Sequence, residues 1–122
     1  MKPEFPGELV VERAGEVWVL TLRGEQDLQT AEALNAELEA VFQQGTKVVV
    51  DLSQATFIDS TTLSRLVRGR QLATSSWRHG FVVCAPAGSV ARRVIRLVSL
   101  EDHIPVFETR DAALESLNGS VG

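Results

Sequence analysis

Short apolar runs and amphipathic stretches alternate along the chain. Residues 9–12 and 17–22 are rich in valine and leucine and flank a short loop containing Gly15, which predicts two strands paired in a hairpin. Residues 48–52 and 81–85 are nearly continuous apolar runs, typical of strands buried on both faces of a sheet. We therefore expect a parallel sheet with the hairpin at one edge.

A first amphipathic helix is predicted over residues 30–42. Its apolar positions recur at helical spacing and are Leu34, Leu38, Val41 and Phe42. Thr30 is the expected N-cap, Glu32 is expected in the favourable first turn, and Gly45 is expected to end the helix.

A second helix is predicted over residues 60–77, with the hydroxyls of Ser60, Thr61 and Thr62 in its cap and first turn. A glycine inside a helix costs about 1 kcal/mol relative to alanine. We therefore expect this helix to lie close to the sheet at Gly69. Three arginines are expected to face water, and these are Arg65, Arg68 and Arg78.

A third helix is predicted over residues 89–100, followed by a short strand over 104–107 and a closing helix over 111–117. The core stripe expected for the third helix comprises Val90, Val94, Leu97 and Val98. The side chains expected outside are Arg92, Arg93 and Arg96.

This order of elements predicts a single α/β domain with a mixed, mostly parallel sheet of about five strands and about four helices. Residues 8–117 are expected to form the domain, with residues 1–7 and 118–122 as tails. Such sheets bind ligands and partners at the carboxyl ends of their strands. Asp27 and residues 59–62 both follow strands, so we expect them to contribute to one surface.

Charge is distributed unevenly around the net value of −4. Residues 1–59 carry eleven acids against four bases, whereas seven arginines and no acid lie between residues 60 and 100. This indicates an acidic or phosphorylated partner or, alternatively, two solvated helix faces balanced by the acidic first half. The net negative charge argues against nucleic-acid binding.

Motifs for catalysis, cofactors and metals are missing from the sequence. It has no glycine-rich phosphate loop with a lysine and no histidine pair at metal spacing, because His79 and His103 are far apart. The single Cys84 lies in an apolar run typical of a buried strand. We expect no enzyme activity, cofactor or metal. The N-terminus lacks the apolar stretch of a signal peptide, and no run is long enough to span a membrane, so we expect a cytoplasmic protein.

The hydroxyls at the start of the second helix form the candidate site. A phosphate there would meet unpaired N–H groups and the positive end of the helix dipole, so the helix would tolerate it. The added charge of about −1.5 to −2 beside Asp59 would disfavour an acidic or apolar partner surface. The alternative is that Ser60 is only an N-cap and that Thr61 and Thr62 are solvated.

Residues 51–63, Asp-Leu-Ser-Gln-Ala-Thr-Phe-Ile-Asp-Ser-Thr-Thr-Leu, resemble the signature turn of STAS domains, the family of bacterial anti-sigma-factor antagonists. Residues 24–28 resemble the family's Gly-Glu-Leu-Asp turn, and residues 80–85 and 90–94 resemble its next strand and helix. The similarity spans about residues 8–117.

The resemblance implies a non-enzymatic, partner-switching regulator of transcription, as in stress responses. In the family, the second residue after the aspartate of the turn is phosphorylated by a partner kinase that doubles as the anti-sigma factor. That position is Thr61, with Ser60 as a secondary acceptor. The unmodified protein would bind the kinase and displace its sigma factor, and phosphorylation would end the binding. The docking surface implied comprises Asp27, Asp59, Ser60, Thr61, Thr62, Ser64, Arg65 and Arg68.

The family usually has serine and glycine at the positions of Thr61 and Thr62. Thr62 adds a β-branched side chain where a partner's backbone would approach. Two alternatives stay open: an unphosphorylated scaffold or transporter-associated subunit, and a binder of nucleotides or small anions. The second would use Arg92, Arg93 and Arg96. None of these readings predicts an oligomeric state.

Overall fold

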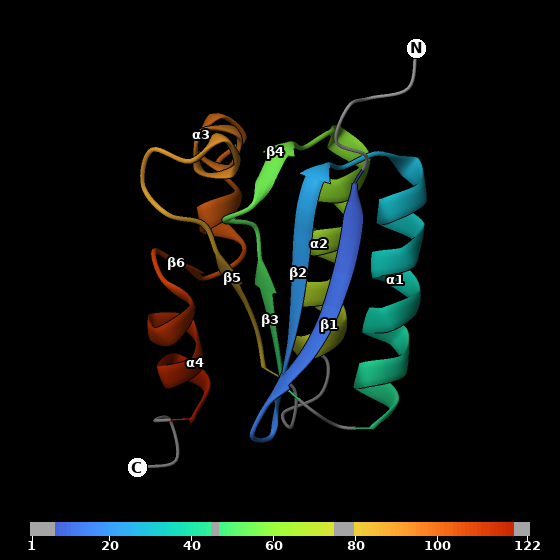
Figure 1. Cartoon of the computed structure of the whole chain (residues 1–122). Helices are drawn as coiled ribbons and strands as arrows, with labels where there is room; N and C mark the ends of the chain where they lie inside the picture. Colours follow the sequence, from blue (N-terminus) through green and yellow to red (C-terminus); the bar gives the residue numbers. More distant parts are fainter. Residues whose placement is uncertain (1–6, 45–46, 75–79, 119–122) are drawn as a thin grey trace.

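A six-stranded sheet with helices on both faces makes up the protein in the computed structural model, which describes residues 7–44, 47–74 and 80–118 (Figure 1). The strands are β1 (Glu8–Ala14), β2 (Val17–Glu25), β3 (Lys47–Asp51), β4 (Ala55–Phe57), β5 (Phe81–Cys84) and β6 (Val106–Phe107). The helices are α1 (Leu28–Gln43), α2 (Ser60–Thr74), α3 (Val90–Leu97) and α4 (Arg110–Asn118), with a short 3-10 helix η1 (Leu100–Asp102).

The sheet has the strand order β1-β2-β3-β5-β6. Among the described strands, β1 pairs antiparallel with β2 and every other pairing is parallel. The mostly parallel sheet with an N-terminal hairpin at its edge confirms the expected fold class. The sheet has one strand more than predicted, which is β4. It pairs with the last residues of β2 and lies outside the main strand order.

The pairing of β4 depends on the length of β2. Residues 17–21 of β2 pair with β3, and Gly24 and Glu25 pair with β4 after a shift of register. Gly24 has a φ of 74°, a backbone conformation that glycine adopts without strain. Its N–H donates to the C=O of Gln54 at 3.0 Å. The chain therefore leaves β3, turns, and continues as β4 beside β2 toward the carboxyl ends of the strands.

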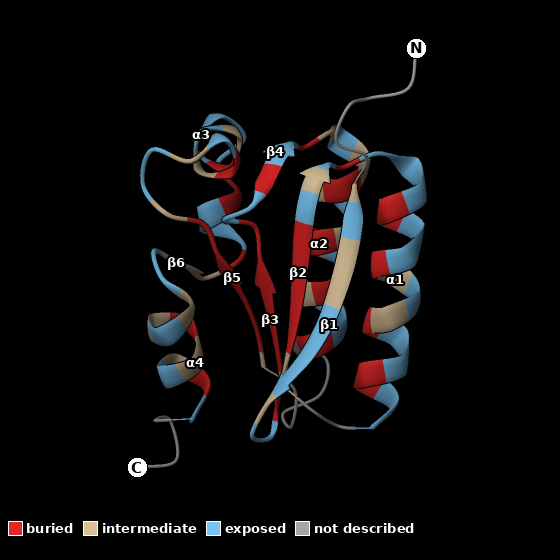
Figure 2. Cartoon of the chain, in the orientation of Figure 1, coloured by how far each residue is buried: buried red, intermediate tan, exposed pale blue. Residues whose placement is uncertain are grey.

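Apolar cores lie on both faces of the sheet (Figure 2). Val48 and Val50 of β3 belong to the core beneath α1 and α2, whereas Val49 belongs to the core beneath α4 with Ala113 and Leu117. Successive side chains of a strand point to opposite faces. A strand covered on both sides therefore needs the continuous apolar run that β3 has.

Gly69 lies where α2 packs closely on the sheet. A Cβ at this position would be 2.9 Å from Cε2 of Phe81 and 3.1 Å from Cδ1 of Leu38. The predicted close approach is confirmed, and a larger side chain here would push α2 away from the sheet.

Helix α1 begins earlier than predicted. Its N-cap is Asp27, so Thr30 is not the cap and Glu32 is not in the first turn. The predicted ends of the first two helices, Gly45 and Trp77, lie outside the described residues, as do Arg78 and His79.

Helix α3 is rotated relative to the predicted orientation. Its buried residues are Ala91 and Ile95, and Val94 is only half-buried. The apolar residues predicted to face the core are largely exposed, at 46% for Val90, 78% for Leu97 and 51% for Val98. The small side chain of Ala91 lets the helix pack closely at this point, and the more hydrophobic stripe is left outside.

Arg92 packs against the protein on the inward side of α3, and its predicted position in water is wrong. Its Nη1 donates to the C=O of Ala85 at 2.9 Å, and its Nη2 forms an ion pair with Glu101 at 3.2 Å. The helix starts after Ser89, whose Oγ accepts the N–H of Arg92 at 3.1 Å. It ends early because Ser99 turns into the left-handed region with a φ of 55°.

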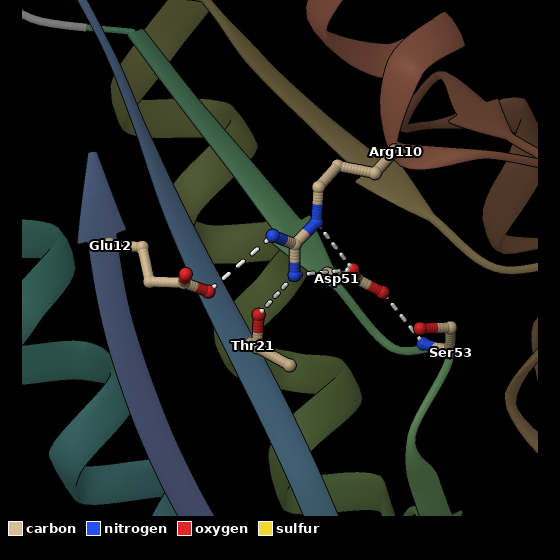
Figure 3. A network of polar contacts seen from close by, with 5 residues as sticks. All are labelled: Glu12, Thr21, Asp51, Ser53 and Arg110. Carbon is tan, nitrogen blue, oxygen red and sulfur yellow. Dashed lines mark hydrogen bonds and ion pairs between the residues drawn. The ribbon is translucent and has the colours of Figure 1, made fainter. Parts of the chain in front are cut away.

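A polar network joins α4 to three strands (Figure 3). Arg110 donates from Nε to Oδ2 of Asp51 at 3.1 Å and from Nη2 to the hydroxyl of Thr21 at 2.9 Å. Its Nη1 lies 3.4 Å from a carboxylate oxygen of Glu12. Asp51 is 3% exposed, and its Oδ1 accepts the N–H of Ser53 at 2.9 Å. Both oxygens of this buried carboxylate are therefore paired.

Cys84 lies beside the network and is 1% exposed. Burial, followed by the charge of Asp51 and a hydrogen bond with it, raises the pKa of the Cys84 thiol from 9.0 to about 12. Partial burial acts to lower the pKa of Arg110, but the hydrogen bond and charge of Asp51 outweigh it and raise this pKa above its ordinary value. At neutral pH the thiol is therefore protonated and the guanidinium charged.

Replacing Arg110 by alanine should lower the free energy of unfolding by roughly 3 kcal/mol, because it leaves a buried carboxylate without its countercharge. The measurement is urea denaturation at pH 7. The matched control is Arg23→Ala, since Arg23 pairs with Glu8 at 3.5 Å with side chains 47% and 60% exposed. An exposed pair of this kind contributes about 0–1 kcal/mol. Equal losses in the two variants would contradict the structural role of Arg110.

The Cys84 thiol should make stability fall as the pH rises above about 9, because it ionises near 9.0 when unfolded and near 12 when folded. Its contribution is fully present below pH 9 and is lost toward pH 12, with a slope of at most about 1.4 kcal/mol per pH unit. Urea denaturation of the native chain and Cys84→Ala at a series of pH values isolates this contribution. A stability difference between the two proteins that stays constant throughout would refute the raised pKa.

Candidate functional site

The candidate site lies at the carboxyl ends of the strands, at the edge of the sheet where β2 and β4 end. The N–H of Gln26 donates to the C=O of Phe57 at 2.9 Å and joins the ends of the two strands. Asp27 follows Gln26 directly, and Asp59 comes two residues after Phe57. Both aspartates, and the helices that begin at them, therefore lie at one edge, as expected.

Both helices begin with the sequence Asp-x-x-Thr. In α1, Oδ1 of Asp27 accepts the N–H of Thr30 at 3.1 Å, and the hydroxyl of Thr30 accepts the N–H of Asp27 at 2.8 Å. In α2, Oδ1 of Asp59 accepts the N–H and the hydroxyl of Thr62, at 2.9 Å and 3.0 Å. The aspartates cap the helices, and the threonines, 7% and 1% exposed, hold the caps in place.

The structure corrects the sequence interpretation of two hydroxyls. Ser60 is the first residue of α2 and Asp59 is the cap, so Ser60 is not the N-cap. Thr62 is only 1% exposed, which removes it from the surface that a partner can touch in this conformation. Its hydroxyl is committed to Asp59, and its bulk lies inside the protein rather than in the path of a partner's backbone.

Ser60 and Thr61 differ from Thr62 in having free hydroxyls. Ser60 is exposed and Thr61 is half-buried. Within the described part of the chain, no hydrogen bond involves either hydroxyl. The first turn of α2 contains no acidic residue, so the positive end of the helix dipole is offset only by the capping aspartate.

Side chains of α2 continue the site as a stripe along the helix. Ser60, Ser64 and Arg68 are exposed at intervals of four residues, and Thr61 and Arg65 are half-buried beside them. The Nε atom of Arg65 is buried without a hydrogen-bond partner. Seven of the eight residues predicted for a docking surface are therefore at least partly accessible, and Thr62 is not.

Two apolar residues at this edge were missed by the sequence analysis. Leu28, at the start of α1, is 57% exposed, and Phe57, at the end of β4, is 54% exposed. Leu28 could have been found from the sequence, because it is an apolar residue just before the predicted helix and its apolar stripe. Phe57 could not be found in this way because β4 was not predicted.

Gln26 is a buried polar residue, 1% exposed, at the turn between β2 and α1. Its Nε2 donates to the C=O of Arg23 at 2.8 Å and to that of Gly24 at 3.2 Å. These carbonyls lie where the register of β2 shifts. The side chain therefore supplies hydrogen bonds that the regular ladder does not provide here, and it stabilises the turn that presents Asp27.

Catalytic and metal-binding groups do not gather at this edge. In residues 7–44, 47–74 and 80–118, no group of three or more His, Cys, Asp or Glu side chains could hold a metal ion. His103 directly follows η1 and not the strands β2 or β4 that lead to the candidate site. No helix in the same ranges is long and apolar enough to cross a membrane.

Comparison with known proteins identifies the family. The family model described as Mlab, STAS domain matches residues 9–107. The chain belongs to the STAS domain family. This STAS domain is 36% identical over 104 residues to the anti-sigma-F factor antagonist RsfB of Mycobacterium tuberculosis, covering 84% of this chain and 83% of the relative. By homology it is a member of the anti-sigma-factor antagonists, which confirms the resemblance seen in the sequence.

Solved structures share the architecture of this STAS domain. A crystal structure of an anti-sigma factor antagonist from Mycobacterium paratuberculosis has a TM-score of 0.81 at 31% identity, covering 93% of this chain and 95% of that one. The anti-sigma factor antagonist SpoIIAA in its unphosphorylated form has a TM-score of 0.74 at 18% identity, covering 92% and 97%. The latter likeness concerns the fold alone.

Replacing Asp59 by alanine should lower the free energy of unfolding by about 1–2 kcal/mol, because α2 loses its cap and Thr62 its hydrogen-bond partner. Ser60→Ala, which removes an exposed hydroxyl without a protein partner, should change stability by less than about 0.5 kcal/mol. Urea denaturation compares the two variants. A larger loss for Ser60→Ala would identify Ser60 as the cap and contradict the geometry.

Proposed function

We propose that this STAS domain is a partner-switching anti-sigma-factor antagonist without catalytic activity of its own. In this proposal the unmodified protein binds an anti-sigma factor that is also a serine/threonine kinase, and displaces its sigma factor in the cytoplasm. Phosphorylation of Thr61, with Ser60 as a secondary acceptor, ends the binding. The proposal is supported by the relationship to RsfB, a protein named as an anti-sigma-F factor antagonist.

One observation excludes Thr62 as the acceptor, which is the unequal exposure of the three hydroxyls at the start of α2, and the resemblance to the family motif favours Thr61 over Ser60. Thr62 is buried and bonded to Asp59, whereas the hydroxyls of Ser60 and Thr61 form no hydrogen bond with any described residue. A kinase must bring the acceptor oxygen in line with the phosphate of its nucleotide. A hydroxyl that is inside the fold and holds a helix cap is unsuited to this.

Electrostatics explains how a phosphate at Thr61 would act as a switch. The unpaired N–H groups and the dipole of α2 favour the dianion, so the helix stays folded. The same charge, about −1.5 to −2, would be added beside Asp59 and near Phe57, where the unmodified surface offers apolar contact. A partner that buries this surface would have to desolvate the phosphate, which weakens the complex.

The proposed docking surface combines the predicted residues with the two that were missed. It comprises Asp27, Leu28, Phe57, Asp59, Ser60, Thr61, Ser64, Arg65 and Arg68. Leu28 and Phe57 supply apolar anchors, and the polar and charged residues surround them. This is the composition of a transient protein interface.

Incubation with anti-sigma factors of the histidine-kinase-like class and ATP, followed by mass spectrometry, tests the modification. We expect one phosphate per chain, on Thr61 in the native protein and at most weakly on Ser60 in Thr61→Ala. The control is Ser53→Ala, which removes an exposed hydroxyl outside the proposed docking surface and should leave the modification unchanged. A kinase that binds the chain yet modifies neither Ser60 nor Thr61 would refute the switch.

Calorimetry with Thr61→Glu and Thr61→Gln separates charge from size. We expect Thr61→Glu to weaken binding of the anti-sigma factor by at least about tenfold, because a charge must be desolvated at the interface. Glutamine has nearly the same shape as glutamate but carries no charge, so Thr61→Gln should weaken binding by less than about threefold. Equal affinities of the native protein and Thr61→Glu would instead favour the unphosphorylated scaffold or transporter-associated subunit.

A further inference from the structure

The outer face of α3 is an amphipathic surface without a partner in the described part of the chain. We define it by Val90, Arg93, Arg96 and Leu97, all exposed. Leu97 is 78% exposed, the highest value among the large apolar residues that the structure describes. Helical spacing places the apolar pair on one side of this face and the arginines on the other. Val98, 51% exposed, extends the apolar side past the end of the helix.

The positive charges of this face are available for a partner. Arg92 is held by Ala85 and Glu101 and packs beside the face as a fixed support. Arg93 and Arg96, by contrast, form no ion pair with any described residue. A groove of about 270 Å³ runs between them and is lined by Ala87, Gly88, Ser89, Arg92, Arg93, Arg96 and Leu97.

The helix that carries this face lies beside the docking surface proposed above. Helix α3 packs against β4, whose last residue is the exposed Phe57. Figure 1 shows α3 at the same end of the sheet as the connection from β4 to α2. A partner seated on Phe57 and the start of α2 therefore reaches α3 by extending along β4.

We infer that the outer face of α3 is a second docking surface, which binds an acidic, amphipathic segment of the same protein partner. The inference rests on the proposed function. Carboxylates of such a segment pair with Arg93 and Arg96, and its apolar side chains cover Leu97 and Val90. Binding at two connected surfaces gives a higher affinity for the partner than the contacts around Thr61 would give alone.

Two other occupants fit the charges of the molecule less well. An anionic membrane would be repelled by the rest of the chain, whose net charge is −4. A second copy would have to place a different, acidic surface on α3, and such a head-to-tail contact continues from copy to copy unless it closes into a ring. An acidic segment of a different protein meets neither objection.

Charge reversal on α3 tests the inference. Against the anti-sigma factor that binds the native chain, Arg93→Glu with Arg96→Glu should weaken binding by about tenfold at low salt and make the affinity less dependent on salt. Arg13→Glu is the control, because it reverses an exposed arginine at the end of the β1–β2 hairpin remote from Asp27 and should change the affinity by less than about twofold. Leu97→Ser should weaken binding by a similar or smaller factor, and thermal denaturation checks that each variant is folded.

A photo-crosslinking residue in place of Leu97 identifies the occupant. A crosslink to an acidic segment of the anti-sigma factor supports the inference. A crosslink to a non-acidic segment, a crosslink to a second copy, or binding to vesicles of equal parts phosphatidylglycerol and phosphatidylcholine that Leu97→Ser abolishes would overturn it. So would unchanged affinity after the double reversal.

The same measurements separate this inference from the proposed function. If Thr61→Glu weakens binding and the double reversal does not, the switch stands and α3 has no part in docking. If the reversal weakens binding and Thr61→Glu does not, the second surface stands and the phosphorylation switch fails. If no anti-sigma factor binds the unmodified chain, both are refuted.

Discussion

The pairing of one long strand with two shorter ones determines where this protein presents its surface. β2 has nine residues and β3 has five, so the end of β2 pairs with β4. The hydrogen bond from Gln26 to Phe57 completes this pairing and brings the helix caps Asp27 and Asp59 to one edge. Because each cap is locked by a threonine, this edge is rigid where a partner is proposed to dock.

The polar network on the other face supports the same edge. Asp51 ends β3 and accepts the N–H of Ser53, in the turn that leads the chain toward β4. Arg110 of α4 pairs with Asp51 and also contacts Thr21 of β2 and Glu12 of β1 (Figure 3). A buried carboxylate is unstable without such partners, so the turn, the sheet and α4 depend on one another. The surface that carries Thr61 is thus supported from below by Asp51, a charged residue that is only 3% exposed.

Tertiary packing divides like residues into different roles. Three adjacent hydroxyls begin α2, yet only Thr62 is buried and part of the cap, which leaves Ser60 and Thr61 for chemistry at the surface. In α3, packing buries Ala91 and Ile95 and leaves Val90 and Leu97 exposed. Exposing Leu97 gains nothing for folding, and together with Val90 and Val98 it forms the exposed apolar side of α3 on which the docking inference rests.

The sequence by itself determined the order of the described strands and helices except β4 and η1, the mostly parallel sheet and the family, and through the family resemblance it proposed Thr61 as the candidate acceptor. These follow from apolar periodicity and from a local motif, both of which are properties of neighbouring residues. Only the tertiary structure decided that Thr62 is buried, that β4 pairs with β2, and which side of α3 faces inward. Periodicity shows that a helix has an apolar stripe. The face that is buried depends on contacts between distant segments, such as the packing of α3 against β4, which no local pattern contains.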